Sequence, residues 1–245
     1  MHILAIETTG RLGSAALLNG SGKLLGLETA TGPLSHLREL IPLSGRLLDS
    51  AGLEKRQLTH IAVSAGPGSF TGVRIGVATA RALCQSLALP AVAVPTLTAF
   101  LQKPQALSLP ADTVACAIIN ARRGQVYGVV DGYMPPCACM LTDVLEIARE
   151  QIFPHGKKLF FFGDGIDAYA KQIDEALAGC GSYSFADETC RYQDAASVGK
   201  LALQMIARRQ TVNYAQLEPD YMRQAEAEQK LAAGELPICK GPRQE

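Results

Sequence analysis

The sequence contains no tryptophan, and aromatic residues of all kinds make up only 6% of its 245 residues. A folded core must therefore be built mainly from Leu, Ile, Val and Ala. The sequence also has no excess charge of either sign, because 23 basic residues balance 23 acidic ones. Proteins that bind nucleic acid through many phosphates normally carry a positive excess. We therefore expect no strong independent binding of nucleic acid, although a locally basic face is compatible with this balance.

Signals for a membrane or for secretion are also missing. No hydrophobic run approaches the roughly 20 residues of a membrane-spanning helix. The opening run from His2 is short, ends at Glu7 and has no basic segment before it, which is typical of a strand and not of a signal peptide. Seven scattered cysteines do not form the pattern of a disulfide framework. These absences predict a cytoplasmic protein without membrane contact.

The sequence lacks the residue patterns of two common kinds of catalytic site. The four histidines, at positions 2, 36, 60 and 155, are never three or four residues apart, so no helix presents a histidine pair to a metal. Cys137 and Cys139 have no second cysteine pair, and Ser69 does not lie in a Gly-x-Ser-x-Gly nucleophile elbow. We therefore expect neither a metal site nor a serine nucleophile.

The pattern that is present is that of an α/β protein whose first part opens with three strands. Residues 2–8, 14–18 and 24–29 are short apolar runs separated by turn residues. We predict further strands at 61–64 and 91–94 and helices at 35–50 and 70–87, the first kinked or divided by Pro42. Three strands before a helix are typical of the actin-like ATPase domain, whose first hairpin holds phosphate.

The second part repeats this order without a visible sequence repeat. Residues 102–110 resemble a linker, and they are followed by predicted strands at 114–119, 125–130 and 159–162 and helices at 142–151, 166–178 and 195–209. We predict an N-terminal lobe (1–102) joined by a helix from about 195–210, a smaller second lobe (103–231) and a frayed tail (232–245).

A glycine loop at Gly66-Pro67-Gly68 precedes the helix at 70–87, with Ser69 as its N-cap. Backbone amides at such a junction favour an anion, but the loop matches neither the P-loop nor the dinucleotide pattern. The candidate nucleotide-binding residues are Thr8, Thr9, Gly66 and Gly68. Glu7, at the end of the first strand, is the best single catalytic candidate.

A stripe of small residues, Gly72, Gly76 and Ala80, follows one face of the helix at 70–87. Helical glycine is costly, so the stripe predicts that another backbone approaches closely. That neighbour lies either inside the chain or across a subunit boundary, and we favour the boundary. The predicted interface comprises Leu37, Leu40, Ile41, Leu48, Gly72, Val73, Gly76 and Ala80.

Five segments of the sequence resemble motifs of the bacterial TsaB (YeaZ) family. They are Ile3–Thr8, Ser35-His36 before Leu40-Ile41-Pro42, Gly66–Gly76, Ile119–Tyr127 and Glu218–Glu226. The fourth departs from that family's Asp-Ala-Arg-x-x-Glu-Val-Tyr pattern at Asn120 and Gln125.

The resemblance implies an actin-like ATPase (sugar kinase/Hsp70 superfamily) fold and a role in making N6-threonylcarbamoyladenosine at position 37 of tRNAs that read codons starting with A. In that pathway TsaD transfers the threonylcarbamoyl group, TsaB pairs with TsaD, and the ATPase TsaE joins them. The resemblance thus implies a non-catalytic dimerisation subunit that pairs with a second copy of itself when TsaD is absent. Such a subunit is expected to have no cofactor of its own. ATP or ADP would be bound at the assembled complex, and tRNA would be bound through that complex.

Two other functions compete with this interpretation. An actin-like phosphotransferase acting alone would use Glu7 and the Thr8-Thr9 turn on ATP. A metallopeptidase would need ligands that the sequence lacks: TsaD proteins carry Asn-His-x-x-x-His where this chain has Val94–Ala99. A modest basic patch late in the sequence could contact tRNA, although charged residues near helix ends are usually just solvated. It comprises Arg208, Arg209, Arg223 and Lys230.

Overall fold

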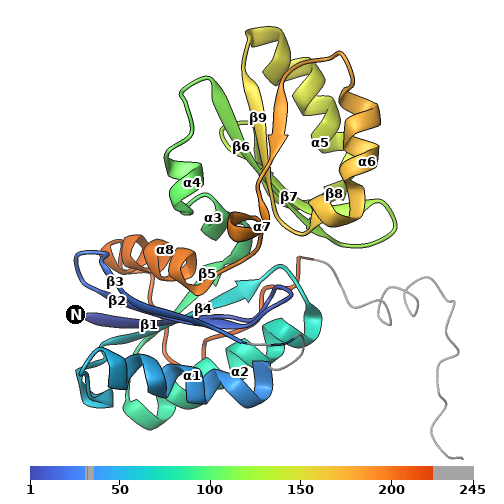
Figure 1. Ribbon diagram of the computed structural model, residues 1–245. Helices are drawn as coiled ribbons and strands as arrows, with labels where there is room; N and C mark the ends of the chain where they lie inside the picture. The colour runs from blue at the N-terminus through green and yellow to red at the C-terminus, as the bar shows by residue number, and fades with distance from the viewer. Residues whose placement is uncertain (31, 33–35, 223–245) are drawn as a thin grey trace, which may run out of the picture.

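The computed structural model describes residues 1–30, 32 and 36–222, and within this range the side chains of His36 and Leu37 are not described. Two lobes are stacked on one another, each built around a five-stranded mixed sheet (Figure 1). The first sheet has the order β3-β2-β1-β4-β5. Its strands are β1 (His2–Glu7), β2 (Ser14–Asn19), β3 (Leu24–Thr29), β4 (His60–Gly66) and β5 (Ala91–Pro95).

The second sheet repeats the arrangement of the first. Its strand order is β10-β9-β6-β7-β8. When β6 to β10 are counted as strands one to five, each strand has the same neighbours as in the first sheet. As there, the first strand pairs antiparallel with the second and parallel with the fourth. The predicted structural duplication is therefore confirmed, and the fold is the actin-like α/β fold. The strands are β6 (Thr113–Asn120), β7 (Gln125–Val130), β8 (Met134–Met140), β9 (Lys158–Phe162) and β10 (Tyr183–Phe185).

Helices cover both faces of the first sheet. Helices α1 (His36–Ser50) and α2 (Phe70–Leu87) lie on the face turned away from the second lobe, and α8 (Ala195–Ala207) lies on the other (Figure 1). Successive side chains of β1 point to opposite faces of the sheet, so this strand contributes to the hydrophobic core on each face. Leu4 and Ile6 pack under α1 and α2, and Ile3 and Ala5 pack under α8.

The second sheet is covered in a similar way. Helices α5 (Leu141–Ile147) and α6 (Gly165–Leu177) pack on one face, and α3 (Thr96–Phe100) and α7 (Glu188–Arg191) pack on the face toward the first lobe. The remaining short elements are η1 (Lys55–Gln57), α4 (Pro104–Leu107), the π-helical η2 (Ala148–Ile152) and η3 (Phe153–His155).

The segment after α8 differs from the predicted domain division. We assigned residues 211–222 to the second lobe, but they return to the first. Val212 forms a bridge with Ala91 beside β5, and the buried Leu217 joins the core under α1 and α2. The amide of Asp220 then donates to the carbonyl of Ala65 at 2.7 Å. The predicted tail (232–245) lies outside the described residues.

Proline positions explain two further differences. Helix α1 runs through Pro42 without division, with the proline on its exposed side. Strand β8 was not predicted, because Pro135 and Pro136 argue against a strand. Both prolines are accommodated because β8 is the edge of its sheet, where fewer backbone amides need partners. Within the described residues, no helix is long and apolar enough to cross a membrane.

Candidate functional site

The catalytic candidate Glu7 lies at the carboxyl end of β1 and is buried, with 1% of its surface exposed. Ser64, on the adjacent β4, donates a hydrogen bond to its carboxyl group, and the Thr9 hydroxyl donates another at 2.7 Å. Burial raises the pKa of the Glu7 carboxyl, and these hydrogen bonds only partly oppose that effect. An enclosed carboxyl group whose oxygens already accept these hydrogen bonds is poorly placed to act as a base or to hold a magnesium ion.

The first hairpin turn contacts the glycine loop and the start of α2. The Ser69 amide donates to the Thr9 carbonyl at 2.8 Å, and the Thr8 hydroxyl donates to the Gly72 carbonyl at 2.7 Å. A Cβ atom on Gly68 would lie 2.6 Å from the Thr9 Cβ, so the glycine gives room to the first hairpin turn. The loop and the turn thus pack together at the place where the sequence suggested a phosphate.

Gly66 is explained by a segment that is far away in the sequence. It has a φ of 126°, and a Cβ atom there would collide with the carbonyl oxygen of Asp220. The chain that returns from α8 therefore covers the glycine loop. No sequence signal near Gly66 could have predicted this contact.

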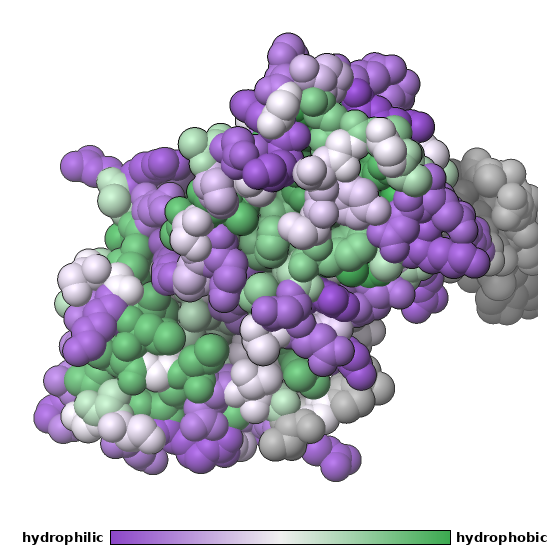
Figure 2. All heavy atoms as spheres, turned by 45° about the horizontal axis from the view of Figure 1, so that its top comes forward, coloured by the Kyte–Doolittle hydropathy of each residue, from purple (hydrophilic) through white to green (hydrophobic). Residues whose placement is uncertain are grey.

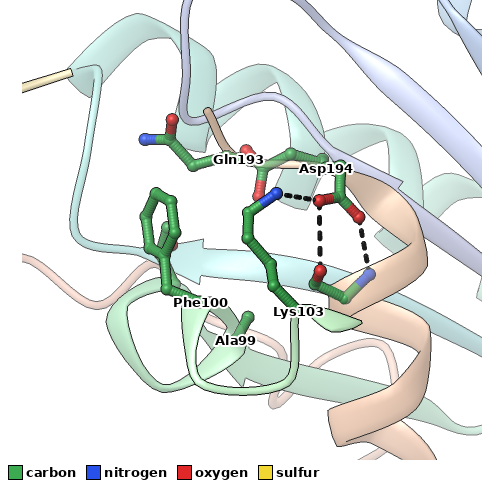
Figure 3. Close-up of a pocket in the computed structure, with 8 residues that line it drawn as sticks. Ala99, Phe100, Lys103, Gln193 and Asp194 are labelled. Atoms are coloured by element: carbon green, nitrogen blue, oxygen red, sulfur yellow. Dashed lines mark hydrogen bonds and ion pairs between the residues drawn. The ribbon is translucent and has the colours of Figure 1, made fainter. Parts of the chain in front are cut away.

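The cleft between the lobes is sealed by polar residues from the two segments that connect them. Lys103, which is 3% exposed, forms an ion pair with Asp194, the residue that caps α8 through the amide of Ser197 (Figure 3). Beside this pair lies a cavity of about 10 Å³, lined also by Glu7 and Thr96. Such a volume holds one water molecule and leaves no space for a nucleotide in this arrangement of the lobes.

The predicted interface requires a correction. Six of its eight residues are buried: Leu40, Leu48, Gly72, Val73, Gly76 and Ala80. The small-residue stripe gives room to Thr8, the residue after β1, because a Cβ on Gly76 would come closer than 3.0 Å to the Thr8 hydroxyl. The close neighbour is therefore inside the chain. Ile41 is 51% exposed, and the side chain of Leu37 is not among those described.

The opposite side of α2 is the accessible one. It exposes Ala78 and Ala82 beside Arg74, Arg81, Gln85 and Pro219, which line an open groove of about 480 Å³. We call this side of α2, together with Ile41 on α1, the outer face.

An aromatic cluster extends the outer face at the N-terminus of α2. Phe70 and Tyr221 are each 42% exposed, with ring centroids 5.2 Å apart. The Arg74 guanidinium lies 3.9 Å from the centre of the Phe70 ring, and its Nε donates to the Tyr221 hydroxyl at 2.9 Å. Sequence analysis missed this cluster, because Tyr221 is 147 residues from Arg74.

Another hydrophobic area lies on the side of α8. On this helix Leu203, Met205 and Ile206 are only partly buried. The space-filling view has a hydrophobic area at its lower left (Figure 2). None of the predicted interface residues belongs to this area.

The residues that would correspond to the TsaD histidine motif lie at the end of β5 and in α3. Val94, Leu97 and Ala99 are buried in hydrophobic clusters there, and Thr96 lines the sealed cavity. Among the described residues, no group of three or more His, Cys, Asp or Glu side chains could hold a metal ion.

Comparisons with known proteins agree with this architecture. A family model described as "TsaD: tRNA N6-adenosine threonylcarbamoyltransferase" matches residues 33–231, more than half of the chain. The chain is 31% identical to the tRNA threonylcarbamoyladenosine biosynthesis protein TsaB of Bacillus subtilis, over 94% of this chain and 97% of that protein. It is 28% identical to the protein of the same name from Haemophilus influenzae, over 96% and 99% of the two chains.

A solved structure is similar over most of the chain. YeaZ from Pseudomonas aeruginosa aligns with a TM-score of 0.70 at 25% identity, covering 90% of this chain and all of that one. The chain therefore belongs to the family that the matching model describes and, within it, to the TsaB (YeaZ) proteins of tRNA threonylcarbamoyladenosine biosynthesis.

Proposed function

We propose that this chain is a non-catalytic scaffold subunit that binds a TsaD protein through the outer face. In this role it supports threonylcarbamoyl transfer to adenosine 37 of tRNAs that read codons starting with A. TsaE joins the pair, and ATP or ADP is bound at the assembled complex. Without TsaD, the same outer face pairs with a second copy of the chain.

The observation that carries the proposal is the contrast between a sealed cleft and an accessible helix face. Glu7 is enclosed by hydrogen bonds, and the neighbouring cavity has room for one water molecule. Chemistry at the cleft would require Lys103 and Asp194 to separate. The catalytic site is therefore supplied by the partner.

The outer face has the features of a helix-docking surface. Ala78 and Ala82 are small and exposed, which lets a partner helix approach closely. Phe70, Tyr221 and Arg74 form an exposed cluster at one end of that face, and aromatic residues and arginine are the usual anchors of protein interfaces. Ile41 adds an exposed aliphatic side chain from α1.

Reconstitution of the tRNA modification tests the proposal. Purified TsaD and TsaE from the same organism are supplied with tRNA and threonylcarbamoyl adenylate, with and without this chain. We expect product formation to depend on the chain and to be unchanged by Glu7→Gln, with circular dichroism as the control for folding. Full product formation without the chain would contradict the scaffold role. Loss of activity in a folded, TsaD-binding Glu7→Gln variant would instead indicate a catalytic cleft.

A further inference from the structure

The turn between β6 and β7 has an uncommon backbone. Three consecutive residues lie at positive φ: Arg122 at 65°, Arg123 at 54° and Gly124 at 75°. The turn is closed by two hydrogen bonds of 3.0 Å, one from the Gln125 amide to the Arg122 carbonyl and one from the Ala121 amide to the Gln125 carbonyl. Glycine adopts this conformation freely, but the Cβ of any other residue crowds its own carbonyl there.

Arg122 and Arg123 adopt this conformation away from any helix end. The other two non-glycine residues at positive φ among those described, Ala88 and Arg209, follow the ends of α2 and α8. A left-handed residue is common at such helix ends. Hairpin turns that need positive φ are instead dominated by Asn, Asp and Gly. Strain kept at a position where relaxed residues are available indicates that the side chains serve another purpose.

The turn is held in place by α6 and by the residue before it. The Asn120 side-chain oxygen accepts from the Arg122 amide at 2.8 Å and from the Tyr169 hydroxyl at 3.1 Å. The Gly124 amide donates to the same hydroxyl at 3.2 Å, and Asp164 accepts from the Asn120 amide at 3.0 Å. This network fixes the backbone before any ligand arrives, which lowers the entropy cost of binding.

The exposed chemistry of the turn is that of an anion receptor. Both arginines are exposed, and in the part of the chain that the structure describes Arg122 has no carboxylate partner. A guanidinium group is planar, always charged and able to donate two parallel hydrogen bonds to a phosphate. With a net charge of zero, this protein can contact a polyanion only through such local groups.

We propose that the Arg122–Arg123 turn contacts the phosphate backbone of tRNA when the chain is in its complex. The inference rests on the proposed function, because the partner brings the tRNA to this chain. The position of the turn is compatible with that arrangement. It belongs to the second lobe, whereas α1 and α2 cover the far side of the first lobe (Figure 1). A partner on the outer face therefore leaves the turn accessible.

The test replaces the turn by the sequence that its backbone prefers. The double variant Arg122→Asn with Arg123→Gly removes both charges and relieves the strain. We expect a higher melting temperature for the isolated chain and weaker binding of tRNA by its complex with TsaD, measured by fluorescence anisotropy at several salt concentrations. The slope of log K against log salt should become shallower by about 0.7–0.9 for each phosphate that the protein no longer neutralises.

A matched control removes two exposed charges elsewhere in the same lobe, with Arg149→Gln and Lys171→Gln. Unchanged tRNA affinity and salt slope in the turn variant would overturn the inference, as would a lower melting temperature, which would mean that the arginines stabilise the fold. Loss of TsaD binding by the turn variant alone would assign the arginines to a protein interface and would also overturn it. If the wild-type chain fails to bind TsaD on gel filtration, the proposed function itself is contradicted.

Discussion

Replacing Gly76 by alanine distinguishes two explanations of the small-residue stripe, a neighbour inside the chain and a partner protein. The two explanations predict changes of opposite sign in the stability of the chain. If the stripe faced a partner, the added methyl group would be harmless in the monomer. Alanine would then stabilise α2 by up to about 1 kcal/mol, the difference in helix propensity between the two residues. In the structure, the new Cβ would come closer than 3.0 Å to the Thr8 hydroxyl and lie 3.2 Å from a methyl group of Val63.

The size of the effect follows from these contacts. Thr8 is fully buried and cannot move freely, because its hydroxyl donates to the Gly72 carbonyl at 2.7 Å. Overpacking costs about 1–3 kcal/mol, and a weakened buried hydrogen bond costs about 1 kcal/mol more. Subtracting the gain in helix propensity leaves a destabilisation of about 1–3 kcal/mol. For a chain of this size, each kcal/mol lowers the melting temperature by about 2–4 °C.

The assay is thermal unfolding followed by circular dichroism. Gly45→Ala is the matched control, since Gly45 is also inside a helix but a Cβ there would meet nothing within 4 Å. We expect the control to raise the melting temperature and Gly76→Ala to lower it by several degrees. A rise in both variants would refute the placement of the stripe against Thr8 and Val63.

Three further predictions concern the cleft and the outer face. Burial raises the pKa of Glu7 above its ordinary value of 4.5, so the folded state favours the protonated carboxyl and loses stability as pH rises from about 4.5 toward the folded-state pKa. The melting temperature of Glu7→Gln minus that of the wild type should therefore increase with pH. A difference in melting temperature that does not vary with pH would contradict this. Lys103→Met should cost about 1–3 kcal/mol in urea unfolding, because it leaves the Asp194 carboxylate without its cation; an unchanged midpoint would show that the pair is unimportant. Tyr221→Ala should weaken TsaD binding measured by calorimetry by about tenfold or more, and unchanged affinity would remove Tyr221 from the interface.

The first lobe could be predicted from the sequence to a large extent. Its strands and helices follow from short apolar runs and from a period near 3.6, and Ser69 caps α2 as predicted, accepting from the Gly72 amide at 3.2 Å. The duplication could be predicted because the second part repeats the same order of elements, even though no residues repeat. Strand β8 was missed because its two prolines are allowed only by its edge position, which depends on the other strands.

The site could be predicted only in part. The spacing of small residues along a helix shows where another segment comes close, but it does not show which segment that is. The period of Gly72, Gly76 and Ala80 correctly indicated one crowded helix face, yet the neighbours are Thr8 and Val63 of the same chain and not a partner. The role of Gly66 depends on Asp220, more than 150 residues later in the chain. Arg122 and Arg123 carry no turn signal of their own, so the left-handed turn is visible only in the backbone.

The central claim is that the outer face of α2 is where a TsaD protein binds, and one affinity measurement tests it most directly. Ala78→Arg places a long charged side chain in the middle of that face without touching the core, and Ala168→Arg makes the same change on an exposed position of α6. Calorimetric titration with TsaD should show the first variant binding at least about 100-fold more weakly, equivalent to about 2.8 kcal/mol, and the second binding like wild type. Equal affinity of both variants, with unchanged melting temperatures, would contradict the account.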